Sequence, residues 1–457
     1  MISEQSVSSW AREKGIAIFW PRDFTASREM PADLLELNSL ASLYDFRESP
    51  CIDYGKFQLK IPRFCLRPHN QEQLLSCVNF LRENEIQYKV RAAGHSSGGQ
   101  VLTDEGAVLD SRLLTRVIRQ EESSIAVEGG IWWLSLFERL AAEGKRPVVM
   151  TDNPRTSVAG TISVGGYGDT SHLYGPQTHS VERIKLLTPD GAFHDAGPGD
   201  PLFQFALGGR GQLGILVEVE LKTIHRSAFM TVRPLHWKSL QEFVDDSIGL
   251  IANKAYEYLR ARLRYDRESN HFVRGLAGNF GEKIPDTGSI RFARQNPIER
   301  IDLLDVIRRN PADLWNHCSP AVEIVLPLPE GLRIWEKLNQ KMIQEGLIRF
   351  LPRGYSVMIL KSDRSLPLVP FPDSNYCMLI AIRPMMNLSD VHRFLPLLRS
   401  LGRDALEAGG KLYLMSIDVE HPDFLRLQFG DALGSFQKLK QQVDPLHLCN
   451  PGLLDRA

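Results

Sequence analysis

The feature that most restricts the fold is a strand–helix–strand pattern that runs directly into a glycine-rich loop. Residues 59–66 are predicted to form a strand, and the apolar residues of stretch 71–84 then fall on one face of a helix. Asn70 precedes this helix as its expected N-cap. Residues 86–90 alternate in polarity, as a strand does, and lead into the loop 94–99. Glycines in such a loop allow the backbone to approach a flat or anionic ligand closely.

The length of the chain predicts more than one domain. Its 457 residues exceed what a single hydrophobic core usually serves. Strand and helix patterns with glycine turns continue to about residue 225, and mixed patterns with fewer glycine loops follow. We expect an α+β protein with an arm at 1–57, a first domain at 58–225, a second domain at 226–425 and a C-terminal segment at 426–457. Within these, residues 424–448 are predicted to form one amphipathic helix that ends at the Asp-Pro pair within the stretch.

Composition excludes several classes of function. Lys and Arg total 54 and Asp and Glu total 55, so the chain has no electrostatic footprint for nucleic acid or an anionic membrane. The six cysteines include no pair at CxxC spacing, which favours buried, reduced thiols over a metal site. The N-terminal stretch lacks the apolar core of a signal peptide, and no stretch has the length of a membrane span. We expect a soluble, cytoplasmic protein without a bound metal.

The stretch 209–214 matches the dinucleotide fingerprint GxGxxG, but its context argues against that function. The fingerprint needs a preceding strand and a following helix, so that the helix N-terminus meets the pyrophosphate. Here residues 215–224 alternate apolar and charged side chains and are predicted to form a strand. The sequence therefore predicts a glycine turn that feeds a strand, with its backbone near a ligand.

Two other segments carry candidate binding residues. Segment 91–100, RAAGHSSGGQ, holds an accessible imidazole in His95 and hydrogen-bonding side chains in Ser96 and Gln100. Segment 151–166, TDNPRTSVAGTISVGG, concentrates small residues whose backbone N–H groups suit a diphosphate. Each segment taken alone is more often an ordinary loop, and Asp152 is equally suited to be a helix N-cap.

Together the segments resemble a known family. The strand–helix–strand unit followed by RAAGHSSGGQ, TDNPRTSVAGTISVGG and GGRGQLGIL is similar to the FAD-binding (PCMH-type) domain of vanillyl-alcohol-oxidase-type flavoproteins, and within them to cytokinin dehydrogenases. The pattern GHSxxGQ stands at residues 94–100, and the stretch YGPQ at 174–177 has tyrosine where the family has histidine. The C-terminal stretches Tyr413-Leu414, FGD at 429–431 and the Asp-Pro and Pro-Gly pairs after residue 443 also resemble that family's ending.

The resemblance implies an α+β, two-domain FAD-linked oxidase fold, with an FAD-binding PCMH-type domain and a substrate domain built on an antiparallel sheet. The arm would pack on the FAD domain and the C-terminal segment would return to it. By that similarity FAD is bonded covalently to His95, and Asp152 lies over the reactive ring as the proton acceptor. The expected cofactor-binding residues are Ala92, Ala93, Gly94, His95, Ser96, Gln100, Thr151, Asp152, Ser157, Gly160, Thr161, Ser163, Gly165, Gly166, Gly214, Ile215 and Tyr413.

The implied reaction is hydride transfer from a C–N bond of a small secondary amine, with oxygen or a quinone as electron acceptor. The stretch 409–414 also resembles sugar and aldonolactone oxidases, so an alcohol or sugar substrate is the alternative. Ser416 stands where some of those relatives have lysine, which argues against direct transfer of that activity. A non-catalytic binding protein on a flavin-oxidase scaffold is the third possibility.

Three further groups of residues are assigned structural roles. Trp132 and Trp133 open a predicted amphipathic helix and are expected in the core. The histidines 172 and 179 flank the stretch YGPQ and are expected at the surface. The arginines at 260, 262 and 264 alternate with apolar or aromatic residues, which favours the solvated face of a strand.

Overall fold

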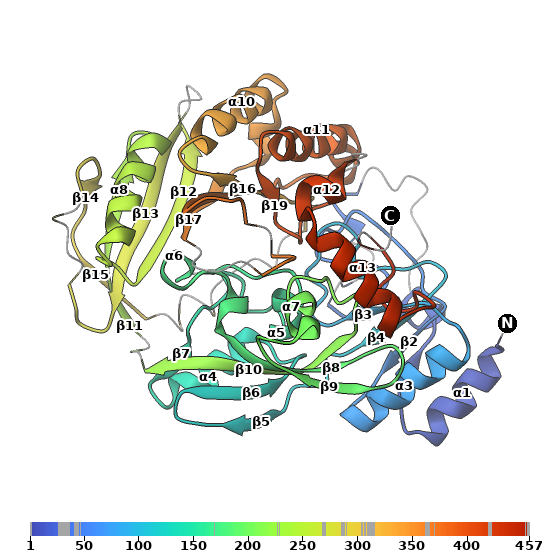
Figure 1. Ribbon diagram of the computed structural model, residues 1–457. Coiled ribbons are helices and arrows are strands. Elements are labelled where there is room, and N and C mark those ends of the chain that lie inside the picture. The colour runs from blue at the N-terminus through green and yellow to red at the C-terminus, as the bar shows by residue number, and fades with distance from the viewer. Residues whose placement is uncertain are drawn as a thin grey trace.

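The computed structural model describes residues 2–454 except 26–36, 41–44, 46, 169, 226, 228, 267–270, 285–287, 289, 303–304, 306–307, 309–315, 362–365, 370, 419–422 and 453. In this part of the chain three sheets form two layered regions, one below the other in Figure 1. Two smaller sheets and their helices make up the lower region. A larger antiparallel sheet with helices on its outer face makes up the upper region, and we call it the cap sheet.

The first sheet grows from the strand–helix–strand unit that the sequence predicted. Its strand order is β1-β2-β4-β3, in which β2, β4 and β3 are parallel and β1 is antiparallel to β2. The bounds are β1 Ala17–Phe19, β2 Phe64–Arg67, β3 Tyr88–Arg91 and β4 Ala107–Asp110. Strand β2 therefore starts five residues later than the predicted start at residue 59, so that part of the prediction was wrong.

Helix α3, Gln71–Glu83, connects β2 to β3 and begins as predicted. The side chain of Asn70 accepts a hydrogen bond from the backbone N–H of Gln73, which makes Asn70 the N-cap. The N-terminal arm packs against this helix through α1, Glu4–Glu13, whose Trp10 stacks on Phe80 with ring centroids 4.0 Å apart. Helix α2, Pro21–Thr25, follows β1. The arm thus supplies a strand and a packed helix to the first sheet.

The second sheet has the order β5-β6-β10-β8-β9, and β7 also pairs with β10. Its strands are β5 Val117–Gln120, β6 Ser124–Glu128, β7 Lys145–Pro147, β8 Val181–Leu187, β9 Phe193–Ala196 and β10 Ile215–His225. The helices of this region are α4 Trp133–Ala141, α5 Val158–Ile162, α6 Ser171–Tyr174, the 3-10 helix η3 Gln177–Ser180 and α7 Pro201–Ala206. Stretch 209–214 lies between helix α7 and strand β10, so the prediction that a strand follows it is confirmed.

The cap sheet has nine strands in the described part of the chain, in the order β14-β11-β13-β12-β17-β18-β16-β19, with β15 also paired to β11. They are β11 Phe229–Trp237, β12 Tyr258–Tyr265, β13 His271–Phe280, β14 Arg294–Gln295, β15 Glu299–Asp302, β16 Val322–Pro327, β17 Tyr355–Lys361, β18 Tyr376–Ile382 and β19 Lys411–Leu412. Neighbouring strands pair antiparallel throughout. The predicted α+β class with an antiparallel second sheet is confirmed.

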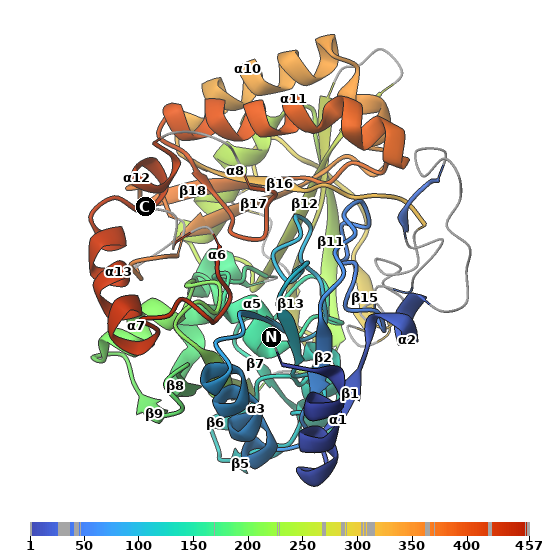
Figure 2. The same cartoon turned by 90° about the vertical axis from the view of Figure 1, so that its right-hand side faces the viewer.

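Helices cover one face of the cap sheet, and its other face is directed toward the lower region. These helices are α8 Leu240–Ala252, α10 Gly331–Gln344 and α11 Leu388–Glu407, and the 3-10 helix η4 Leu347–Phe350 follows α10. Figure 2 shows α10 and α11 along the outer face of the sheet. Residues on the opposite face, among them Arg262, Glu323 and Met358, line the space between the two regions.

The C-terminal stretch forms two helices, not the single helix predicted. Helix α12, Phe424–Phe429, ends at Gly430, whose φ of 54° is in the left-handed region, and α13, Ala432–Val443, then starts in a new direction. A buried ion pair between Lys440 and Asp444 fastens the end of α13, with Nζ and Oδ2 2.6 Å apart. Lys440 also donates to the backbone oxygen of Gln212, which ties α13 to the lower region.

All six cysteines are buried free thiols, as the sequence predicted. Trp133 is fully buried as expected, and its indole N–H donates to the hydroxyl of Thr161 at 2.9 Å. His172 is buried as well, so its predicted surface position was wrong. Among the described residues, no helix has both the length and the apolar character needed to cross a bilayer.

Candidate functional site

A cavity of about 320 Å³ lies between the lower region and the inner face of the cap sheet. Its walls come from segments that are far apart in the sequence. Segment 91–100, segment 151–164 and the start of β10 supply the lower wall, and strands β12, β16, β17 and β18 supply the upper wall. A volume of this size is within the usual range for small-molecule sites.

The loop that carries His95 is held in place by a buried carboxylate from the N-terminal arm. Asp53 is fully buried and accepts hydrogen bonds from the hydroxyl of Ser96 and the backbone N–H of Gly99, each at 2.8 Å. Burial raises the pKa of Asp53 above its usual range, and these hydrogen bonds act against that rise. The backbone N–H groups of Tyr54 and Gly55 donate to the oxygens of residues 94 and 96. The arm thus shapes this loop.

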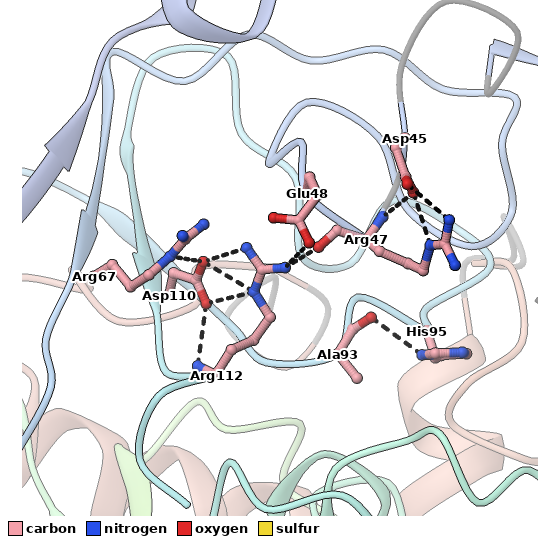
Figure 3. A network of polar contacts seen from close by, with 8 residues as sticks. All are labelled: Asp45, Arg47, Glu48, Arg67, Ala93, His95, Asp110 and Arg112. Carbon is pink, nitrogen blue, oxygen red and sulfur yellow. Dashed lines mark hydrogen bonds and ion pairs between the residues drawn. The ribbon is translucent and has the colours of Figure 1, made fainter.

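His95 itself is oriented by two contacts. Its Nδ1 lies 3.1 Å from the backbone oxygen of Ala93 (Figure 3), and its ring stacks on Tyr54 with centroids 5.3 Å apart and planes 22° apart. Because a carbonyl oxygen only accepts, Nδ1 is the donor in this contact. The imidazole is therefore held in one orientation at the cavity wall.

A cationic network lies behind the loop, as Figure 3 shows. Asp110, at the end of β4, accepts from Arg67 and from Arg112, each at 2.8 Å. Burial opposes the charge on Asp110, but the hydrogen bonds and charges of these arginines outweigh it and lower the pKa of Asp110. Arg112 also lies 3.7 Å from Glu48. This network fixes the ends of β2 and β4 next to the loop.

The loop offers unsatisfied backbone donors to the cavity. Within the described residues, the backbone N–H groups of Ala93, Gly94 and Ser96 have no protein acceptor. All three residues line the cavity. Gly94 has a φ of 70°, which L side chains rarely adopt, and a Cβ there would crowd the guanidinium of Arg91, so glycine is favoured at that position. Unpaired backbone donors around a glycine form a cradle that suits a phosphate group, and these residues therefore fit the diphosphate of FAD.

Asp152 faces the cap sheet across the cavity. Its carboxylate lies 3.5 Å from the guanidinium of Arg260 on β12. Arg262, two residues along the same strand, also lines the cavity and interacts electrostatically with Asp152. Burial lowers the pKa of Arg262 to about 10, and the neighbouring charge of Arg260 acts in the same direction. The prediction that these arginines form a solvated face was wrong for residues 260 and 262, because the lower region covers that face.

A second acid lines the cavity opposite Asp152. Glu323 on β16 has a side chain only 2% exposed, and its Oε1 lies 2.8 Å from Nε and 2.7 Å from Nη2 of Arg383. Burial disfavours the charge of Arg383, but Glu323 outweighs this effect and raises the pKa of Arg383. The cavity thus presents two carboxylates, Asp152 from the lower wall and Glu323 from the upper wall, each paired with an arginine of the cap sheet.

An aromatic pair, Tyr167 and Tyr413, also lines the cavity. Tyr413 and Tyr167 have ring centroids 5.4 Å apart. The backbone N–H of Gly166 donates to the hydroxyl of Tyr413, while burial raises the pKa of that hydroxyl. Apolar residues of β16, β17 and β18 pack against this pair, among them Val325, Met358 and Leu379. The surroundings of the pair are apolar, which suits an aromatic ring.

Nearly all the predicted cofactor-binding residues line this one cavity. They are Ala92, Ala93, Gly94, His95, Ser96, Gln100, Thr151, Asp152, Ser157, Gly160, Thr161, Ser163, Gly214, Ile215 and Tyr413. Gly165 and Gly166 are outside its wall, and Gly166 contributes through Tyr413. The alternative role of Asp152 as a helix cap is excluded, because Ser157 is the N-cap of α5. The roles of these residues toward a cofactor stay predictions.

Comparisons with known proteins agree with this geometry. Residues 62–197 match the family model of the FAD binding domain. The chain is 23% identical to "Uncharacterized oxidoreductase ORF5 in fasciation locus" of Rhodococcoides fascians, over 88% of this chain and 95% of that protein. It is also 27% identical to cytokinin dehydrogenase 7 of Oryza sativa subsp. japonica, over 52% of this chain and 49% of that protein. Cytokinin dehydrogenase 3 of Arabidopsis thaliana is 27% identical over 38% of this chain and 35% of that protein.

These matches show what the chain is similar to. Residues 62–197 are similar to an FAD binding domain, and the similar proteins are an oxidoreductase and cytokinin dehydrogenases by name. The chain is a distant relative of the cytokinin dehydrogenases, and the matched stretch spans about half the length of the rice enzyme. The predicted resemblance is confirmed at this level.

Sequence reasoning missed several residues of the site. Asp53 lies in an arm that has no clear periodicity. Glu323 and Arg383 had a usable signal, because a carboxylate inside the apolar strand β16 requires a cation nearby. Arg260 and Arg262 were noticed for their alternation but were assigned to solvent. The alternation itself was correct, and only the environment of that face was misjudged.

Proposed function

We propose that this protein is an FAD-dependent oxidoreductase with its flavin bonded to His95 and with Asp152 as the proton acceptor. The observation that carries the proposal is that His95 and Asp152, from two separate segments, line the same cavity. In this proposal the backbone donors of residues 93–96 bind the diphosphate, and the apolar surface at Tyr413 and Tyr167 supports the ring. When bound, FAD accepts a hydride from a carbon that bears N–H or O–H.

The chain's own residues then orient the substrate and move the proton. Asp152 takes the proton from the substrate nitrogen or oxygen as the hydride leaves the neighbouring carbon. Arg260 fixes the direction of that carboxylate through their ion pair. The cap sheet closes the cavity from above and limits the water that reaches the reacting carbon. The proposed donor is a small secondary amine, as in the cytokinin dehydrogenases to which the chain is similar.

An alcohol or sugar-like carbinol is the second candidate donor. The cavity is lined by the charged side chains of residues 152, 260, 262, 323 and 383, and such a lining suits a polar substrate. Anaerobic bleaching of the bound flavin distinguishes the two donors. If the donor is a secondary amine, an isoprenoid adenine is expected to bleach the flavin. If the donor is a carbinol, sugar alcohols or lactones are expected to bleach it.

The flavin linkage is tested on the purified protein. We expect a yellow protein whose colour stays with the precipitate after acid denaturation, and we expect His95→Ala to release its FAD into the supernatant. His69→Ala, at an exposed position outside the cavity, is the matched control and should retain the colour. Flavin that stays attached to the denatured His95→Ala variant would refute the linkage. A colourless wild-type protein would instead favour a non-catalytic binding protein.

A further inference from the structure

Arg262 is a charged side chain of the cavity whose partner the protein does not supply. It lies on the inner face of β12 and lines the cavity. Within the described residues no hydrogen bond or ion pair reaches its guanidinium. Arg260 and Arg383, the neighbouring cations of the upper wall, are paired with Asp152 and Glu323 respectively. One positive charge of this wall is therefore left without a direct counter-charge.

An unsatisfied hydroxyl lies next to this guanidinium. Ser356 on β17 is the direct cross-strand partner of Arg262 in the antiparallel pairing of β12 and β17. Side chains at such positions start about 5 Å apart on the same face of a sheet. The Oγ of Ser356 is buried and has no hydrogen-bond partner among the described residues, and Ser356 lines the same cavity. Buried hydroxyls are rarely left unpaired, so this pair of donors points to a ligand.

The chemistry of the two donors narrows the ligand. A guanidinium presents a planar set of N–H donors that matches the oxygens of a carboxylate or a phosphate. The adjacent hydroxyl adds a donor to the same group. Asp152 attracts the guanidinium of Arg262 but forms its ion pair with Arg260. A charge without a direct partner in a partly desolvated wall is costly, and an anionic ligand lowers that cost. A neutral ligand would leave the charge of Arg262 unbalanced.

We propose that the substrate of this site carries an oxyanion group, a carboxylate or a phosphate, which binds to Arg262 and Ser356. This inference rests on the proposed function, because it assigns the substrate class of the same cavity. The oxidised carbon of the substrate lies toward Asp152 and its anionic group lies toward β12 and β17. A neutral purine without such a group leaves both donors unused.

Isothermal titration of the full-length protein, as purified, tests the proposal with three probes of similar shape. Benzoate and benzamide differ in charge, and phenyl phosphate distinguishes phosphate from carboxylate as the preferred anion. We expect the wild-type protein to bind at least one of the two anions about ten-fold or more tightly than benzamide, since hydrogen bonds to a charged group are the strong ones. This preference should weaken as ionic strength rises. Equal binding of the anions and benzamide would overturn the proposal.

Variants assign the preference to these residues. Arg262→Gln should abolish the preference for anions, Arg262→Lys should retain part of it, and Ser356→Ala should weaken anion binding several-fold. Arg264→Gln is the matched control, because residue 264 is on the same strand face but outside the cavity wall. Two results overturn the proposal: an anion preference that survives in Arg262→Gln, and a change in flavin absorption in that variant with the preference intact. The latter would mean that Arg262 serves the cofactor.

The titration does not depend on colour, so the two proposals fail separately. A colourless protein that still prefers the anions would contradict the proposed flavin chemistry and retain the oxyanion site. A yellow protein with covalent flavin and no anion preference would contradict the oxyanion site and retain the proposed flavin chemistry.

Discussion

The buried His172 makes the stability of this protein sensitive to mild acid. His172 lies on α6 in the lower region, and its Nε2 is 3.3 Å from the backbone oxygen of Tyr256. Burial lowers the pKa of His172 to about 4, from an unfolded value of 6.5, while the contact with Tyr256 acts weakly in the opposite direction. The folded state therefore binds fewer protons than the unfolded state between these two pH values, and acid favours unfolding.

The size of the effect follows from the two pKa values. The contribution of His172 to the free energy of unfolding is fully present above pH 6.5 and is lost as pH falls toward the folded pKa of about 4. At about 1.4 kcal/mol for each pH unit between the two values, the loss is about 2 kcal/mol at pH 5 and about 3 kcal/mol at pH 4. Tyr256 lies two residues before the start of β12, which carries Arg260 and Arg262, so this contact also joins the lower region to the cap sheet.

Urea unfolding of wild type and His172→Gln at pH 7, 5 and 4 measures this effect at constant ionic strength. Glutamine keeps an N–H donor for the oxygen of Tyr256 and has no titration in this range. As the pH falls, we expect the free energy of unfolding of the wild type to decrease more than that of His172→Gln, by about 2 kcal/mol at pH 5 and about 3 kcal/mol at pH 4. His69→Gln, at an exposed histidine, should follow the wild type. Identical pH profiles for wild type and His172→Gln would refute the reasoning.

Two further predictions concern the proposed base and the C-terminal anchor. Asp152→Asn should retain the yellow colour and slow anaerobic flavin bleaching by substrate about a hundred-fold or more, as loss of a general base does; a near wild-type rate removes Asp152 from the mechanism. Lys440→Met should destabilise the protein by about 3–5 kcal/mol in urea unfolding, because it leaves the buried carboxylate of Asp444 without its cation. The exposed Lys438→Met on the same helix should change stability little, and equal losses in both variants would contradict the anchor role.

Much of the lower region could be predicted because its determinants are local. The N-cap Asn70, the helix that follows it and the strand β3 all depend on residues within a few positions of one another. The stretch 209–214 could likewise be separated from a dinucleotide fingerprint by the strand that follows it. The prediction of one C-terminal helix was wrong because a single glycine determines where a helix ends. Gly430 adopts a left-handed conformation and ends α12, although the apolar pattern continues across it.

The charged residues of the upper wall could not be predicted in the same way, because their environment depends on contacts distant in sequence. Alternating arginines on a strand have the same pattern whether their face meets water or a closed cavity. Only the position of the lower region against β12 decides between the two, and that position is set by contacts such as His172 with Tyr256. The same argument applies to Glu323, whose cation Arg383 lies on another strand's end.

The two regions contribute different kinds of groups to the site. The donors proposed to hold the cofactor are backbone groups of a glycine loop, and this loop was recognised in the sequence from its glycines together with the segments that follow it. The groups proposed to select the substrate are side chains on β12, β16 and β17, which line the cavity from the cap sheet. In this proposal a change at 262 or 356 alters the substrate preference and leaves the loop at 93–96 in place. Similarity in the FAD-binding domain therefore predicts the cofactor of this protein, whereas the donors of the cap sheet are the groups that we propose to specify its substrate.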